Sequence, residues 1–224
     1  MSFDPSRVKG VCFDVDGTLS DTDDEWVSEI ESRLRGMGFL FPAQRARLLA
    51  RWMVMASETP MNAVYHWLDA MSLDDTFARI YERMILNRKH PPKNFWLMAD
   101  ARETLESLVG HFPLSVVSAR DELTTRGFLE QFSLDGFFHA VATAQTCEHT
   151  KPYPQPVLWA AQQMQVPPDT CVMIGDTTVD ILAGKSAGAQ TIGLLCGFGT
   201  ERELRKAGAD LILKDLRELR DYLQ

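Results

Sequence analysis

The sequence predicts an α/β fold, in which a parallel sheet carries helices on both faces and a helical cap is inserted after the first strand. First, an apolar segment at residues 8–13 ends in the acidic turn Asp14-Val15-Asp16-Gly17-Thr18. Second, residues 20–96 show helical periodicity without a convincing strand. Third, short apolar segments alternate with helical ones from residue 100 onward. This alternation is typical of βαβ units and therefore of a parallel sheet.

The elements follow from this pattern in chain order. The first strand is expected over residues 8–13, because six mostly apolar residues there precede a glycine turn. Glycines and prolines divide the insert into four expected helices, at residues 24–37, 43–55, 60–71 and 73–87. Later apolar segments predict five more strands, at residues 115–118, 139–143, 170–175, 190–195 and 210–213. We therefore expect two domains, a core of residues 1–19 and 97–224 and a cap of residues 20–96.

Composition and charge narrow the class of protein. The chain has 224 residues, 45% of them hydrophobic and 24% charged, which is typical of a globular protein. Its net charge of −8 argues against nucleic acid as a partner. No apolar run suits a membrane span, and the N-terminus lacks a signal-peptide pattern. The four cysteines have no zinc-type spacing and are expected to be reduced, which favours a cytoplasmic location.

The turn after the first strand indicates a metal site. Asp14 and Asp16 would share one face of the strand and project from its carboxyl end, where open α/β sheets bind ligands. Adjacent carboxylates repel unless a cation lies between them, and Mg²⁺ suits a site shared with phosphate. The residue pattern Asp-x-Asp-Gly also occurs in calcium-binding loops. Those loops are flanked by helices, however, and need further acidic ligands.

Three more segments follow, each at or after an apolar strand. Ser118 ends one strand beside a helix start, where backbone N–H groups can hold a phosphate. Lys151 lies on a loop stiffened by prolines. Asp176 ends another strand, and Asp180 falls in the first turn of the next helix. Taken singly, each segment also fits an ordinary turn or a surface charge.

In this order the four segments resemble the haloacid dehalogenase-like (HAD) hydrolase superfamily, and within it the phosphoglycolate phosphatase and β-phosphoglucomutase branch. That resemblance implies a Rossmann-like core and a helical cap. It implies that Asp14 is the nucleophile and Asp16 the general acid/base. One position departs from many relatives, because Arg120 stands where they carry Asn-Lys or a small residue.

The resemblance also implies the binding residues. Phosphate would be held by Ser118, Ala119 and Lys151. Mg²⁺ would be bound by Asp14, the backbone carbonyl of Asp16, and Asp176, with Thr18 and Asp180 in support.

The expected function is Mg²⁺-dependent hydrolysis of a small phosphorylated metabolite through an aspartyl-phosphate. A phosphosugar mutase would use the same two aspartates, and a non-catalytic binding or regulatory protein is a third interpretation. We expect a monomer or homodimer, in which the cap covers the site and reads the leaving group. The substrate stays open among phosphoglycolate, sugar phosphates, nucleotide monophosphates and pyrophosphate.

Overall fold

A computed structural model describes residues 3–21 and 95–223 of the chain. These residues belong to one compact unit, formed by residues 1–21 and 94–224. The four helices expected in the insert lie outside the described residues. The cap and its boundaries therefore stay predictions.

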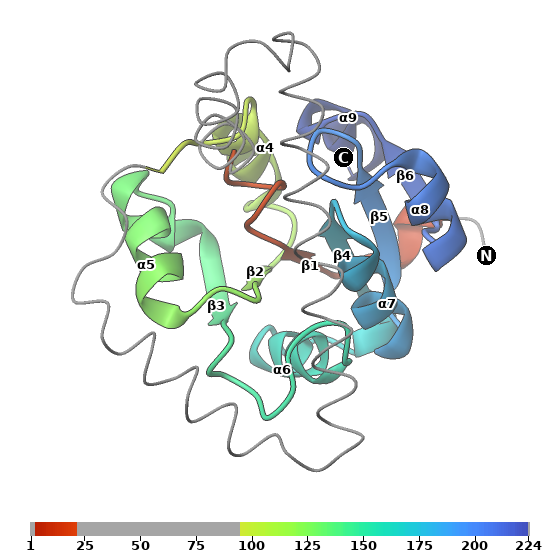
Figure 1. The fold of residues 1–224 in the computed structure, drawn as a ribbon, viewed down its shortest axis with the longest axis horizontal. Helices are drawn as coiled ribbons and strands as arrows, with labels where there is room; N and C mark the ends of the chain where they lie inside the picture. Colours follow the sequence, from red (N-terminus) through yellow and green to blue (C-terminus); the bar gives the residue numbers. More distant parts are fainter. Residues whose placement is uncertain (1–2, 22–94, 224) are drawn as a thin grey trace, which may run out of the picture. The chain divides into compact units, whose positions relative to one another are not determined.

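The core is a six-stranded parallel sheet with the order β3-β2-β1-β4-β5-β6 (Figure 1). Its strands are β1 (Gly10–Phe13), β2 (Leu114–Val117), β3 (Phe138–Ala142), β4 (Cys171–Gly175), β5 (Gln190–Leu194) and β6 (Leu211–Leu213). All six lie where the apolar segments predict strands. This strand order is that of the Rossmann fold, so the predicted Rossmann-like class is confirmed.

Both faces of the sheet are covered, as its strand residues require. Val11 and Phe13 of β1 belong to an apolar cluster with residues of α4 (Ala101–Leu108), α5 (Glu122–Gln131) and α9 (Leu216–Leu223). Cys12, between them in sequence, belongs to a second cluster with residues of α6 (Gln155–Gln163) and α7 (Thr178–Ser186). Successive side chains of a strand point to opposite faces, and each face is buried by its own helices.

The remaining elements are short. Helix α8 (Glu201–Ala207) joins β5 to β6, and its first turn is closed by a reciprocal Thr200 and Glu203 capping box. Three 3₁₀ helices lie at Pro5–Arg7, Asp135–Phe137 and Pro168–Thr170. None of the helices among the described residues is both long and apolar enough to span a membrane.

The sheet order places the functional site. From β1 the chain continues to β2 and β3 on one side, and it then returns to β4, β5 and β6 on the other. The direction of winding therefore reverses between β1 and β4. Ligands of such sheets bind at this switch point, beyond the carboxyl ends of the strands.

Candidate active site

Asp14 lies at the carboxyl end of β1, in the middle of the sheet. Its backbone N–H donates to the carbonyl of Ile174 in β4 at 2.9 Å, which extends the ladder by one residue. Beyond it the chain turns sharply, because Leu19 and Ser20 both donate their N–H groups to the carbonyl of Val15. Gly17 adopts a φ of 71° in this turn, a conformation that favours glycine. Asp14 is thereby held at a fixed point, 5% exposed.

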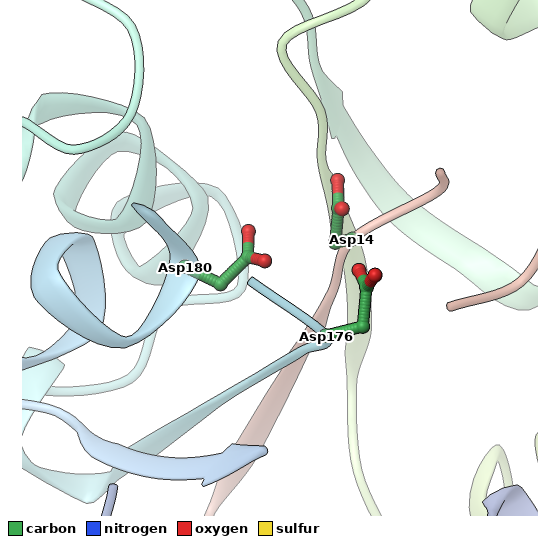
Figure 2. A group of neighbouring side chains, drawn as sticks. All are labelled: Asp14, Asp176 and Asp180. Carbon is green, nitrogen blue, oxygen red and sulfur yellow. The ribbon is translucent and has the colours of Figure 1, made fainter. Parts of the chain in front are cut away.

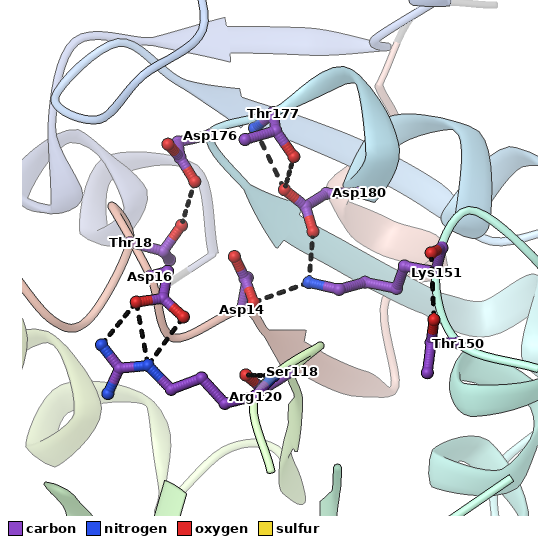
Figure 3. A network of polar contacts seen from close by, with 10 residues as sticks. All are labelled: Asp14, Asp16, Thr18, Ser118, Arg120, Thr150, Lys151, Asp176, Thr177 and Asp180. Carbon is purple, nitrogen blue, oxygen red and sulfur yellow. Dashed lines mark hydrogen bonds and ion pairs between the residues drawn. The ribbon is translucent and has the colours of Figure 1, made fainter. Parts of the chain in front are cut away.

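Lys151 is the cation that meets Asp14. Its Nζ lies 2.6 Å from Asp14 Oδ1 and 2.6 Å from Asp180 Oδ1, and all three side chains are buried (Figure 3). Asp180 also accepts hydrogen bonds from the backbone N–H and hydroxyl of Thr177 through Oδ2. The start of α7 therefore fixes Asp180, and Asp180 helps to fix Lys151.

Burial and charge act in opposite directions on these groups. Burial raises the pKa of Asp14 to about 8, because the attraction of Lys151 only partly offsets desolvation and the repulsion of Asp180 and Asp16. Burial would lower the pKa of Lys151, but Asp14 and Asp180 outweigh it and raise that pKa well above the ordinary value. The site therefore holds more negative charge than Lys151 alone can balance.

Asp176, at the end of β4, completes the acidic group. Its Oδ2 accepts the backbone N–H of Phe198 at 2.7 Å, and its Oδ1 accepts the Thr18 hydroxyl at 3.3 Å. The segment between β5 and α8 closes around it, since a Cβ at Gly197 would overlap the Asp176 carboxylate and the Gly17 carbonyl. Thr18 thus contacts Asp176, and its supporting role in metal binding stays a prediction.

The carboxyl groups of Asp14, Asp176 and Asp180 gather at this end of the sheet (Figure 2). They offer ligand atoms that all lie within 4.8 Å of one another, and all three residues are buried. A buried group of oxygen donors with excess negative charge suits a hard divalent cation such as Mg²⁺. The residues present therefore fit the metal that the sequence predicts.

Asp16 lies differently from Asp14. Its carboxylate accepts hydrogen bonds from Arg120 Nε at 2.9 Å and 2.7 Å and from Arg120 Nη2. In Figure 3 Asp14 lies between Lys151 and this Asp16–Arg120 pair. The side chain of Asp16 is thus outside the group of three carboxylates. Its two predicted roles, as general acid/base and as a metal ligand through its carbonyl, stay predictions.

Ser118 and Ala119 follow β2 at the same edge. Ser118 is 2% exposed, and its N–H donates to the carbonyl of Ala142 at 2.9 Å. Its hydroxyl accepts the backbone N–H of Arg120 at 3.1 Å. Ala119 is exposed. Their predicted contact with phosphate remains a prediction.

The family model for haloacid dehalogenase-like hydrolases matches residues 11–194, which is most of the chain. The chain belongs to this family. The HAD-like chain is 29% identical to pyrophosphatase PpaX of Anoxybacillus flavithermus over 220 aligned residues. The aligned residues cover 97% of each protein. It is 26% identical to a phosphoglycolate phosphatase of Mannheimia succiniciproducens, over 96% of this chain and 97% of that one.

A solved structure shares the fold of this HAD-like protein. It is a HAD family hydrolase from Deinococcus radiodurans with bound phosphate and sodium. The two chains are 24% identical, with a TM-score of 0.71 over 97% of this chain and 95% of the other. The family model over residues 11–194 confirms the predicted superfamily.

Two features of the site were not predicted from the sequence. The sequence does not predict the partner of Arg120, although Arg120 departs from the pattern of many relatives. The contacts of Gly197 and Phe198 with Asp176 were missed, and the glycines at 197 and 199 were the available signal.

Proposed function

We propose that this HAD-like hydrolase is a Mg²⁺-dependent phosphomonoesterase that acts on a small phosphorylated metabolite. The observation that carries the proposal is the buried Asp14 carboxyl group, held 2.6 Å from Lys151 and grouped with Asp176 and Asp180. A carboxylate next to a fixed cation is suited to attack phosphorus, because the cation can also hold the phosphoryl oxygens.

The reaction proceeds in two transfers. A carboxylate oxygen of Asp14 attacks phosphorus, the bond to the leaving oxygen breaks, and Asp16 gives its proton to that oxygen. Water then attacks the phosphorus of the aspartyl-phosphate while Asp16 takes a proton from the water. The bond between phosphorus and the Asp14 oxygen breaks, which restores the Asp14 carboxylate and releases inorganic phosphate. Lys151 and Ser118 orient the phosphoryl group throughout.

Mg²⁺ would be held by Asp14, Asp176 and the carbonyl of Asp16, with Asp180 in support. When bound, it supplies positive charge that stabilises the anionic oxygens of the transferring group. The fit of the buried carboxylates to a divalent cation supports this assignment.

The names of the relatives support a phosphate ester or anhydride as substrate, with phosphoglycolate and pyrophosphate as the first compounds to assay. We propose that the insert, residues 20–96, forms the cap that selects among them. A cytoplasmic location and a monomeric or homodimeric state remain predictions.

Replacing the nucleophile tests the proposal. Asp14→Asn keeps the size of the side chain but removes the attacking charge, so Mg²⁺-dependent release of p-nitrophenol from p-nitrophenyl phosphate should fall by about 10³-fold or more. The matched control is Asp135→Asn, since Asp135 is exposed. Near-normal turnover by a folded Asp14→Asn protein would contradict the proposal.

A further inference from the structure

Arg120 is anchored on the loop after β2, at the edge of the candidate site. Its backbone N–H donates to the Ser118 hydroxyl at 3.1 Å, and its carbonyl accepts the N–H of Ala144 at 2.8 Å. Only 13% of its side chain is exposed. The position of Arg120 is therefore set by the core of the protein.

Aromatic rings fix the orientation of the guanidinium. Its central carbon lies 5.4 Å from the centre of the Phe95 ring and 5.8 Å from that of the Phe128 ring. The two rings pack edge to face against each other, with centres 5.9 Å apart. Contacts of this kind orient a guanidinium without using its N–H groups. The rings thus hold the side chain in place while Nε and Nη2 bind Asp16.

Asp16, in contrast, depends on Arg120 for its orientation. It lies in the turn after β1, and 30% of its side chain is exposed, whereas the Asp14 side chain is buried. Among the described residues, Arg120 supplies all the hydrogen bonds that the Asp16 carboxylate accepts, from Nε at 2.9 Å and 2.7 Å and from Nη2 (Figure 3). A partly exposed carboxylate samples several rotamers unless a partner restricts it. Arg120 is that partner.

We propose that Arg120 is a positioning residue that holds the Asp16 carboxyl group in the orientation needed for proton transfer. The inference rests on the proposed function, in which Asp16 gives a proton to the leaving oxygen. Such a transfer requires the two oxygens to lie within hydrogen-bond distance, so a carboxyl group that rotates away takes no part in it. A planar guanidinium that contacts both oxygens of a carboxylate fixes the plane of that carboxylate.

The contact leaves one oxygen of Asp16 able to carry the proton. Oδ1 accepts from both Nε and Nη2, whereas Oδ2 accepts from Nε alone within the described part of the chain. Each oxygen has two accepting positions, so Oδ2 retains one for a proton. As the bond between phosphorus and the leaving oxygen breaks, this proton passes to the leaving oxygen. The carboxylate that remains keeps its contacts with Arg120 and is oriented to take a proton from water in the second transfer.

The test varies how much the leaving group needs a proton. p-Nitrophenolate is a stable anion that leaves without protonation, whereas phenolate is more basic and gains more from a general acid. For each enzyme, kcat/KM is measured with phenyl phosphate and with p-nitrophenyl phosphate, and the ratio of the first to the second is compared with that of wild type. Structural damage that slows both esters equally cancels in this ratio.

Asp16→Asn has no acidic proton to give, so we expect it to lower the ratio most. Arg120→Gln should lower the ratio by at least about tenfold, because general acid catalysis contributes about 10²- to 10⁴-fold and a misplaced acid loses part of it. Arg120→Lys keeps the charge but not the planar fork, so its ratio should fall nearly as far. The control is Arg126→Gln, since Arg126 pairs with Glu122 at the surface and should leave the ratio unchanged.

The variants separate this inference from the proposed function. A lowered ratio in Asp16→Asn together with a wild-type ratio in Arg120→Gln would overturn the positioning role and leave the proposed function intact. A wild-type ratio in Arg120→Lys would also overturn it, because charge alone would then suffice, and this variant decides the matter should Arg120→Gln fold poorly. A wild-type ratio in Asp16→Asn would overturn the acid role of Asp16 and this inference with it, whereas Asp14→Asn tests nucleophilic attack separately.

Discussion

Lys151 shows how single residues balance charge at this site. A buried ammonium group is costly by itself, and its contacts with Asp14 and Asp180 offset that cost. Burial also raises the pKa of Asp14 to about 8, because the attraction of Lys151 does not offset desolvation and the repulsion of the neighbouring carboxylates. Without a metal ion, Asp14 is therefore the group that retains a proton on folding.

This pKa has a consequence for stability. The pKa of Asp14 is higher in the folded chain than its ordinary value of 3.8, so the folded state binds more protons between pH 4 and 8. The free energy of unfolding contributed by Asp14 therefore falls as pH rises through this range and levels off above about 8.

Asp14→Asn removes this proton linkage. In EDTA, we expect the variant to gain stability relative to wild type as the pH rises from 5 to 8. Urea unfolding at several pH values measures the difference, and Asp135→Asn is the control. A difference that does not change with pH would show that Asp14 ionises normally in the folded protein.

Among the elements, two turns from distant parts of the chain form the surroundings of Asp176. The turn after β1 provides Gly17 and Thr18, and the segment after β5 provides Gly197 and Phe198. Neither glycine has room for a Cβ, because the Asp176 carboxylate occupies that space. The position of the carboxylate thus depends on how closely these segments approach.

Gly197→Ala tests this close packing. The added methyl group should displace the Asp176 carboxylate and raise the Mg²⁺ concentration needed for half-maximal activity by about tenfold or more, as loss of supporting contacts does at metal sites. The control is Gly136→Ala, where a Cβ would have no neighbour within 4 Å in the described part of the chain. A normal Mg²⁺ requirement in a folded Gly197→Ala protein would mean that the loop yields without moving Asp176.

At the scale of the whole molecule, the metal and the fold should be linked. Asp14 directly follows β1, whereas Asp176 directly follows β4 and Asp180 lies in α7. The repulsion between Asp14 and the other two carboxylates therefore acts between segments far apart in sequence. A cation that binds them stabilises the folded state only, by about 2.7 kcal/mol at a concentration of 100 Kd.

We therefore expect Mg²⁺ to raise the unfolding temperature and EDTA to reverse the effect. Asp176→Asn should weaken this response, because it removes one of the clustered charges, whereas Asp169→Asn, outside the acidic cluster, should leave it unchanged. Thermal unfolding followed by circular dichroism measures the shift. A shift in Asp176→Asn as large as that in wild type would place the metal elsewhere.

The sequence by itself determined the core fold and placed Asp14 and Asp176 directly after apolar strands. Apolar segments marked all six strands, because buried parallel strands need such residues on both faces. The resemblance to the HAD superfamily predicted that Asp14 and Asp176 bind one metal ion. Each of them directly follows an apolar strand, and the structure places both at the carboxyl edge of the sheet. The positions of Thr18, in the turn after the first strand, and of Asp180, in the first turn of a helix, also follow from the neighbouring residues in the sequence.

Only the tertiary structure decided the partners of side chains that reach across the site. Arg120 and Asp16 are 104 residues apart, and their pairing depends on how β1 and β2 align and on where Phe95 and Phe128 stack. Gly197 and Phe198 meet Asp176 because of the path that the chain takes from β5 to α8. Neighbours in sequence decide which residues form a strand, a turn or a helix. These contacts depend instead on how separate elements pack against one another, and a local sequence pattern does not specify that packing.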